Sequence, residues 1–150
     1  MCNINFQSLK NKGCELQAFL ATENPDVIGT ETWLNSSVKT CEYVPPNYSV
    51  FRRGRLDCYG GVLEAVKDLI CQEVDEFCSD FEAVWVKVSI SSRKHAYVGA
   101  FYNPDSSCEA LDELDSSLSK LFKKSGNSVI YLGGDICWET STVTRGSRCA

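Results

Sequence analysis

Two kinds of periodicity alternate over the first thirty residues, and this alternation constrains the fold more than any other feature of the chain. The apolar residues of 4–9 predict a strand, whereas leucine and phenylalanine recur at helical spacing over 12–22. Pro25 follows, and because proline cannot continue a helix, the helix ends before it. Residues 27–30 then predict a second strand. A strand, a helix and a strand within about thirty residues are typical of a βαβ unit.

The rest of the chain continues this mixture of strands and helices. Ser106 and Glu109 have the spacing of a capping box, so a second helix is expected to begin there and to end at Gly126. The remaining runs predict strands over 48–52, 61–66, 81–90, 95–102 and 129–132. We therefore expect one mixed α/β domain over 1–138. The Ser-, Thr- and Arg-rich residues 139–150 show no periodicity and are expected to form an irregular tail.

Composition excludes several classes of protein. The 150 residues are 43% hydrophobic and 23% charged, as in a globular domain. No apolar run approaches the ~20 residues that span a bilayer, and no signal peptide is recognisable. We therefore expect an intracellular protein, nuclear or cytoplasmic, that is neither secreted nor membrane-bound. The nine cysteines are odd in number and form no Cys-x-x-Cys pair, so reduced thiols are expected, and the single histidine argues against zinc.

A basic and aromatic segment interrupts an otherwise acidic chain. The formal net charge of −5 argues against a protein that coats nucleic acid, but it is compatible with an enzyme that has an acidic metal site. Arg52, Arg53 and Arg55 stand close to tyrosine and phenylalanine residues and predict a surface that contacts DNA phosphates. The alternative is a solvated hairpin tip without a ligand.

Polar side chains stand in or at the ends of four predicted strands. Asn5 lies in the first strand, whereas the residues that end later strands are Glu31, Tyr102 and Asp135. If these strands belong to one sheet, an amide, two carboxylates and a phenol meet at one rim, beyond the strand ends where α/β sheets bind ligands. Such oxygen ligands suit Mg²⁺, which uses few protein ligands and keeps waters for a phosphate substrate. The alternative is that these are solvated loop residues.

Five short segments resemble motifs of the endonuclease/exonuclease/phosphatase superfamily, and more closely those of the endonuclease domain of LINE-type (non-LTR) retrotransposons. They occur in the family's order across residues 3–138: Asn5–Lys12, Pro25–Leu34, Tyr59–Leu63, Ala100–Pro104 and Leu132–Asp135. The resemblance implies an α/β fold, the mixed-sheet portion of the four-layer, DNase I-like sandwich of that superfamily, in an incomplete form.

The resemblance also implies an activity, namely metal-dependent phosphodiester cleavage that nicks DNA. Glu31 would hold Mg²⁺, with Asn5 nearby, and Mn²⁺ is the alternative ion. Tyr102 would contact the scissile phosphate, and Asp135 would orient the attacking water or bind the metal. A lipid or inositol phosphatase of the same superfamily is a weaker alternative, because the motifs around Asn5 and Glu31 resemble the retrotransposon branch more closely.

Two departures from the family pattern lead us to expect a truncated domain with weak or no activity. The family's Gly-Asp-x-Asn motif has an amide two residues after the aspartate, where this chain has Cys137. A thiol is only a weak donor and acceptor and does not replace an amide. Either a point change or a short deletion after Asp135 explains the difference. No Ser-Asp-His motif follows Trp138, so the rival interpretation is a non-catalytic remnant that binds DNA or protein.

Glu64 is a further departure, since the resembled family has an apolar residue at this strand position. Two environments are open for it. A strand that is buried on both faces would enclose an unpaired carboxyl group at a cost in free energy. A strand whose outer face lacks covering elements would leave the carboxylate in solvent.

Overall fold

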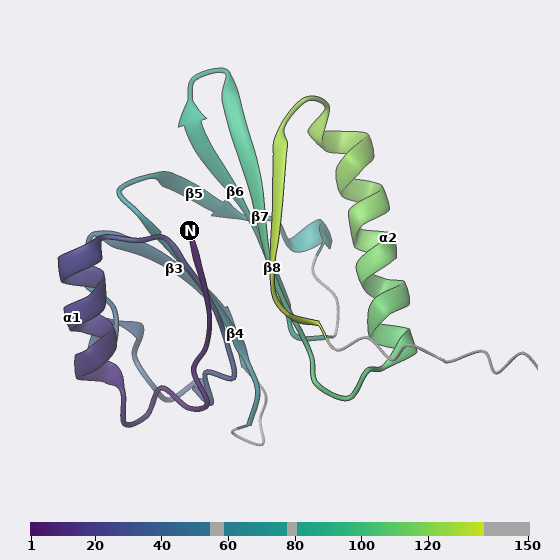
Figure 1. Ribbon diagram of the computed structural model, residues 1–150. Coiled ribbons are helices and arrows are strands. Elements are labelled where there is room, and N and C mark those ends of the chain that lie inside the picture. The colour runs from purple at the N-terminus through teal and green to yellow at the C-terminus, as the bar shows by residue number, and fades with distance from the viewer. Residues whose placement is uncertain (55–58, 78–80, 137–150) are drawn as a thin grey trace, which may run out of the picture.

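The residues that the structure describes form two four-stranded sheets packed face to face, with one helix on the outer face of each sheet (Figure 1). The computed structural model describes residues 1–54, 59–77 and 81–136. The first sheet has the strand order β1 (Cys2–Asn5), β2 (Val27–Thr30), β4 (Val62–Lys67) and β3 (Tyr48–Arg53). The second has the order β5 (Ile70–Glu73), β6 (Ala83–Ser91), β7 (Lys94–Asn103) and β8 (Val129–Ile136). The prediction of a mixed α/β fold is confirmed.

The two helices each join a pair of parallel strands. Helix α1 (Gly13–Glu23) connects β1 to β2, which run parallel, so the predicted βαβ unit is confirmed. Helix α2 (Cys108–Ser125) connects β7 to β8, which are also parallel. All other neighbouring strands are antiparallel. Two single 3₁₀ turns, Thr40–Glu42 and Asp75–Phe77, lie in the connections. Neither described helix is long and apolar enough to span a membrane.

Three apolar clusters hold these four layers together. The first lies between α1 and its sheet and contains Leu16 and Leu20. The second lies between the two sheets and is composed largely of valines. The third lies between the second sheet and α2, where Trp85 is 1% exposed, as its alternation with valines predicts. The β-branched residues fit the tightly packed space between two pleated sheets, whereas leucines fill the helix–sheet layers.

Glu64 occupies the valine-rich layer between the sheets, and its side chain is completely inaccessible to solvent. Neither carboxylate oxygen has a hydrogen-bond partner within the described residues. Burial raises the pKa of this carboxyl group well above its usual range, although the backbone of Ala100 offsets part of the effect, and the charge of Glu73 raises the pKa further. Of the two environments open from the sequence, the enclosed one is therefore observed.

Several element boundaries differ from the predictions for identifiable reasons. The first strand ends at Asn5 instead of residue 9, because the Asn5 side-chain oxygen accepts a hydrogen bond from the Gln7 N–H and turns the backbone. Helix α2 is capped by Ser107 and not by Ser106, since the Ser107 hydroxyl accepts from the Ala110 N–H. The short strand β5 was not predicted, and it begins at Ile70, which is 79% exposed and gives no burial pattern.

The last strand is longer than predicted. The Gly133–Gly134 pair lies inside β8 and does not turn the chain away from it. A Cβ on Gly134 would lie 1.8 Å from the Phe101 carbonyl oxygen, and one on Gly133 would lie 2.7 Å from Ile28. These glycines therefore permit close packing against the chain's own strands. Residues 137–150, with Cys137, Trp138 and the expected tail, lie outside the described residues.

Candidate active site

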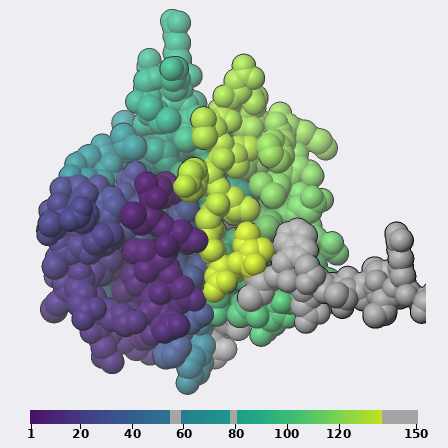
Figure 2. Space-filling model, in the orientation of Figure 1, coloured from purple at the N-terminus to yellow at the C-terminus, as the bar shows by residue number. Residues whose placement is uncertain are grey.

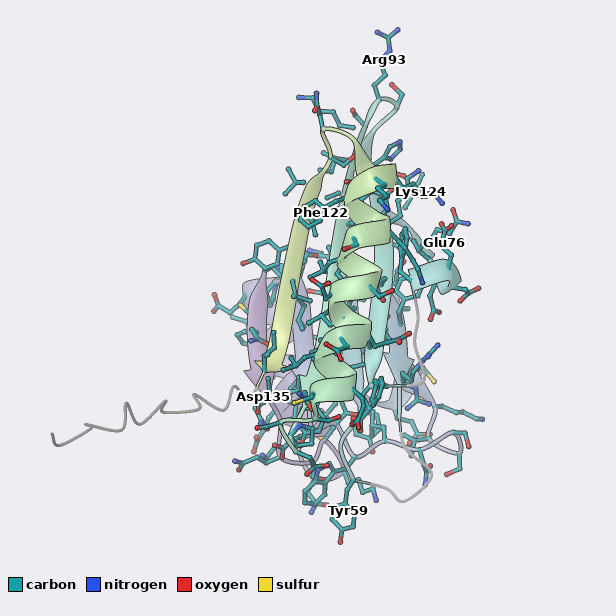
Figure 3. All side chains as sticks on the ribbon, turned by 90° about the vertical axis from the view of Figure 1, so that its right-hand side faces the viewer. Tyr59, Glu76, Arg93, Phe122, Lys124 and Asp135 are labelled. Atoms are coloured by element: carbon teal, nitrogen blue, oxygen red, sulfur yellow. The ribbon has the colours of Figure 1, made fainter. Side chains whose placement is uncertain are left out.

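Four strands bring their carboxyl ends to the same end of the molecule. The parallel pairs β1–β2 and β7–β8 belong to different sheets, and the edge strands β1 and β8 lie side by side (Figures 1 and 2). Asp135, near the end of β8, lies toward the same end as Tyr59, whereas Arg93 lies at the opposite end (Figure 3). The predicted convergence at one rim is therefore observed, but the rim is shared by two sheets and not formed by one.

Asn5 connects the two carboxylates of this rim. Its Nδ2 donates to Glu31 Oε1 at 2.8 Å and to Asp135 Oδ2 at 3.1 Å. Its Oδ1 accepts from the Gln7 N–H at 3.1 Å, which fixes the direction in which the amide points. Because two carboxylates at close range repel each other, a shared donor between them stabilises the arrangement even without a cation.

The Glu31 segment follows β2 in an unusual backbone conformation. Glu31 and Trp33 have φ values of 51° and 54°, in the left-handed region that side chains other than glycine rarely adopt. Hydrogen bonds hold the segment on both sides: the Glu31 carbonyl accepts from Ser8 N at 2.9 Å, and Trp33 N donates to the Gly60 carbonyl at 2.9 Å. Strained residues of this kind persist only where the surrounding structure fixes them, and they cluster at functional sites.

Tyr102 completes the group. It pairs in register with Asp135 across β7 and β8, and its side chain is 9% exposed. Burial, together with the negative charge of Glu31, a side-chain hydrogen bond to Glu31, and the charges of Glu82 and Asp135, raises the pKa of Tyr102 to about 12. At neutral pH the phenol is protonated, as an unperturbed tyrosine also is, and is a hydrogen-bond donor.

The donor set of the site fits a hard divalent cation. The described residues contain no cluster of three His, Cys, Asp or Glu side chains that could hold a metal ion. Mg²⁺ does not require such a cluster, because it is commonly held by one or two carboxylates and completed by water and substrate oxygens. Glu31 and Asp135 supply two carboxylates that already face a common donor. The assignment of Asn5 as a metal ligand remains a prediction.

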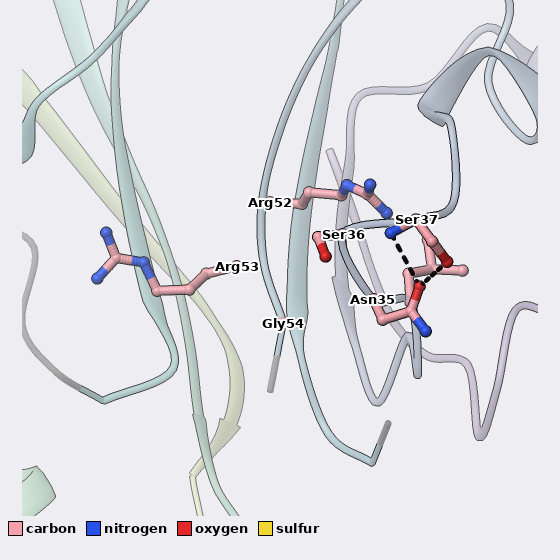
Figure 4. Close-up of a pocket in the computed structure, with 7 residues that line it drawn as sticks. Asn35, Ser36, Ser37, Arg52, Arg53 and Gly54 are labelled. Atoms are coloured by element: carbon pink, nitrogen blue, oxygen red, sulfur yellow. Dashed lines mark hydrogen bonds between the residues drawn. The ribbon is translucent and has the colours of Figure 1, made fainter. Parts of the chain in front are cut away.

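The three arginines do not form one cluster in the described residues. Arg52 and Arg53 are successive residues of β3 and point to opposite faces of the strand (Figure 4). The guanidinium of Arg52 donates to the Val38 carbonyl, and both Arg52 and Arg53 line a cavity of 590 Å³ beside Ser36 and Ser37. Arg55 lies outside the described residues. The predicted contact with DNA phosphates therefore remains a prediction for each arginine separately.

Sequence reasoning missed two polar residues next to this site. Asn3 donates from Nδ2 to the Gly134 carbonyl at 2.9 Å and so ties β1 to β8. Glu82 is 6% exposed, and its carboxylate accepts from the Gly61 N–H. The strand predicted over 81–90 includes Glu82. An acidic residue directly before a buried strand is the sequence signal that distinguishes Glu82 from the strand itself.

Comparison with known proteins rests on structure. No family model and no curated protein sequence matches the chain. A solved structure, the endonuclease domain of TRAS1, a telomere-specific non-LTR retrotransposon, is similar over 89% of this chain with a TM-score of 0.64 and 17% identity. The chain has the fold of a non-LTR retrotransposon endonuclease domain. The fold that the five motifs implied is therefore confirmed. The match covers 56% of the TRAS1 chain, so this chain spans about half the length of that domain.

Proposed function

We propose that the chain is a metal-dependent phosphodiesterase domain of the DNA-endonuclease type, of retrotransposon origin. The observation that supports this most is the Asn5 amide, which joins Glu31 and Asp135 at a strand-end rim beside a protonated Tyr102. The similarity of the fold to a retrotransposon endonuclease gives this arrangement a chemical context. The proposed substrate is DNA, and the proposed ion is Mg²⁺, with Mn²⁺ as an alternative.

Each residue has a separate role in the proposal. Glu31 and Asp135 hold the cation, or Asp135 instead orients the attacking water. A bound divalent cation stabilises the negative charge that develops on the phosphate and on the leaving oxygen. The Tyr102 hydroxyl, which is hydrogen-bonded to Glu31 without substrate, donates its single proton to a phosphate oxygen when Glu31 holds the cation. Asn5 keeps the two carboxylates in place.

The proposed catalysis is weak. The resembled family places an amide two residues after the aspartate, where this sequence has Cys137. Each preorganised donor that is lost at a phosphoryl or acyl transition state costs roughly 10²–10³ in rate. A chain that lacks this amide is therefore expected to cleave slowly. The rival is a non-catalytic protein that binds DNA or protein, for which the Arg52 cavity is a candidate contact.

A plasmid-nicking assay with a parallel binding measurement tests the proposal. Supercoiled DNA is incubated with Mg²⁺ or Mn²⁺ and wild-type protein, with Glu31→Gln, and with Glu23→Gln as the matched control at an exposed position of α1. Nicking by the wild type and the control, but not by Glu31→Gln, is the expected result. Cation binding is followed separately by the water-proton relaxation of Mn²⁺, which should be weakened by the Glu31 substitution alone.

The outcomes separate the alternatives. Cation binding without nicking would support a degenerate site and favour the non-catalytic rival. Neither binding nor nicking would overturn the metal-dependent proposal. DNA retention that falls steeply between low and moderate salt, in the absence of nicking, would indicate binding through phosphate contacts.

A further inference from the structure

Glu82 connects two parts of the rim that are far apart in sequence. It lies immediately before β6, and its side chain is 6% exposed. Its carboxylate accepts a hydrogen bond from the Gly61 N–H, while its backbone carbonyl accepts from Tyr102 N at 3.0 Å. Glu82, which precedes β6 of the second sheet, is thus hydrogen-bonded both to the turn that precedes β4 of the first sheet and to β7, the strand that carries Tyr102.

The turn that Glu82 contacts can only be made with glycine. Gly60 and Gly61 have φ values of 73° and 89°. A Cβ on Gly60 would lie 2.7 Å from the Glu82 carboxylate, and one on Gly61 would lie 2.7 Å from the Thr32 hydroxyl. The glycines therefore let a carboxylate lie directly against the backbone, a contact that any larger residue would prevent.

The same turn holds the residues that follow Glu31. The Gly60 carbonyl accepts from Trp33 N at 2.9 Å, and the Gly61 carbonyl accepts from Thr32 N at 3.4 Å. A displacement of the turn would release these two bonds and with them the left-handed backbone at Trp33. The hydrogen bonds thus run from the Glu82 carboxylate through the glycine turn to the segment that positions Glu31.

We propose that Glu82 is a positioning residue of this rim, whose carboxylate fixes the Gly60–Gly61 turn, and through it the Glu31 segment, relative to Tyr102. The contribution to cleavage rests on the proposed function, but the positioning does not. The carboxylate also acts on Tyr102 through its charge, since Glu82 is one of the groups that raise the pKa of that phenol.

Two substitutions separate the hydrogen bond from the charge. Glu82→Gln keeps an oxygen that accepts from Gly61 N and removes the charge, whereas Glu82→Ala removes both. Glu23→Gln is the matched control, because it removes the same charge from an exposed site on α1. Amide hydrogen exchange of Gly61, Thr32 and Trp33 reports the turn.

The proposal expects a distinct pattern. In Glu82→Ala the three amides exchange at least about tenfold faster, whereas in Glu82→Gln they stay close to wild type. The Glu23→Gln control leaves all three exchange rates unchanged. If Glu82→Ala does not fold, Glu82→Asp is measured instead, because its shorter side chain draws the carboxylate away from Gly61 N, and the same faster exchange is expected.

Unchanged exchange in a folded Glu82→Ala or Glu82→Asp would overturn the proposal. Cleavage is a separate measurement. Where the wild type nicks DNA, Glu82→Ala is expected to lower kcat more than it changes KM, whereas Glu82→Gln, which keeps the hydrogen bond, stays close to wild type. Where the wild type does not nick DNA, the proposed function fails, and the exchange results still decide the role of Glu82.

Discussion

Glu64 shows how a single side chain can make stability depend on pH. It lies between Val62 and Val66 on the face of β4 that packs against the second sheet, and within the described residues its oxygens have no hydrogen-bond partner. Because burial raises its pKa well above the usual range, the folded protein keeps this carboxyl group protonated at pH values where the unfolded chain has released the proton. Raising the pH above the ordinary carboxyl pKa therefore lowers the free energy of unfolding, until the pH reaches the raised pKa of the folded protein.

We predict that Glu64→Leu stabilises the protein at neutral pH by about 1–3 kcal/mol, because it removes an unpaired buried polar group and keeps the volume filled. The wild-type free energy of unfolding should fall by up to about 1.4 kcal/mol per pH unit from the ordinary carboxyl pKa up to the raised one. The variant should lack this slope.

Urea unfolding between pH 5 and pH 8, followed by tryptophan fluorescence, measures both effects. Glu23→Gln is the control for a carboxylate on the surface. Parallel pH profiles for the wild type and Glu64→Leu would contradict the prediction.

At the scale of elements, the packing of β8 against β7 depends on glycine at one position. Gly134 has a φ of 138°, and its backbone lies so close to Phe101 that no side chain fits between them. The parallel register that this contact permits places Asp135 beside Tyr102. The close approach of these two hydrogen-bonded strands thus determines where two of the site residues meet.

Gly134→Ala is expected to destabilise the protein by about 3 kcal/mol or more, since the Cβ would overlap a backbone oxygen that cannot move independently. Gly126→Ala is the matched comparison. Gly126 also has a positive φ, of 57°, but a Cβ there would have nothing within 4 Å, so a loss of only about 1 kcal/mol is expected. Denaturant midpoints for the two variants should differ accordingly, and equal losses would show that the steric contact does not matter.

The elements with strong periodicity could be predicted from the sequence, because their apolar residues face one layer. Both helices, the βαβ unit and the β6–β7 hairpin belong to this group. The short strand β5 could not be predicted, since its exposed Ile70 disguises the pattern. The end of β1 depends on a side-chain oxygen of Asn5 that captures a backbone N–H, an effect that strand propensity does not include.

The site could be predicted in part for a related reason. Parallel strands bring their carboxyl ends together, so the convergence of Glu31 and Asp135 follows once the strands are known. The role of Glu82 could not be predicted, because it depends on a hydrogen bond from Gly61 N. Gly61 precedes a strand of the other sheet and lies 21 positions earlier in the sequence. Contacts between sheets leave no periodic signal in a single sequence.

At the scale of the whole molecule, β8 forms one edge of the second sheet within the described residues, and it carries exposed apolar side chains. Val129 is 63% exposed and Tyr131 is 50% exposed. In the space-filling view β8 lies at the surface beside β1 (Figure 2). An edge strand with free backbone groups and apolar side chains is prone to pair with another chain.

Tyr131→Lys should therefore raise the protein concentration at which self-association begins, because charge on an edge strand opposes pairing. Phe122→Lys provides the comparison: Phe122 is 64% exposed but lies on the helix α2 and not on a strand (Figure 3). Light scattering over a concentration series measures the onset. If both substitutions raise the onset concentration equally, self-association is caused by exposed apolar surface in general and not by pairing at the strand edge.

The bond between Asn5 and Asp135 has a consequence for synthesis of the protein. The two residues are separated by 130 positions, and the other bond between β1 and β8, from Asn3 to Gly134, spans 131. Contacts of such long sequence separation form late, because the intervening chain must first lose its freedom. During translation Glu31 and Asn5 emerge long before Asp135, and the nascent chain folds its N-terminal portion first. The two carboxylates of the rim can meet only after almost the whole described chain has left the ribosome.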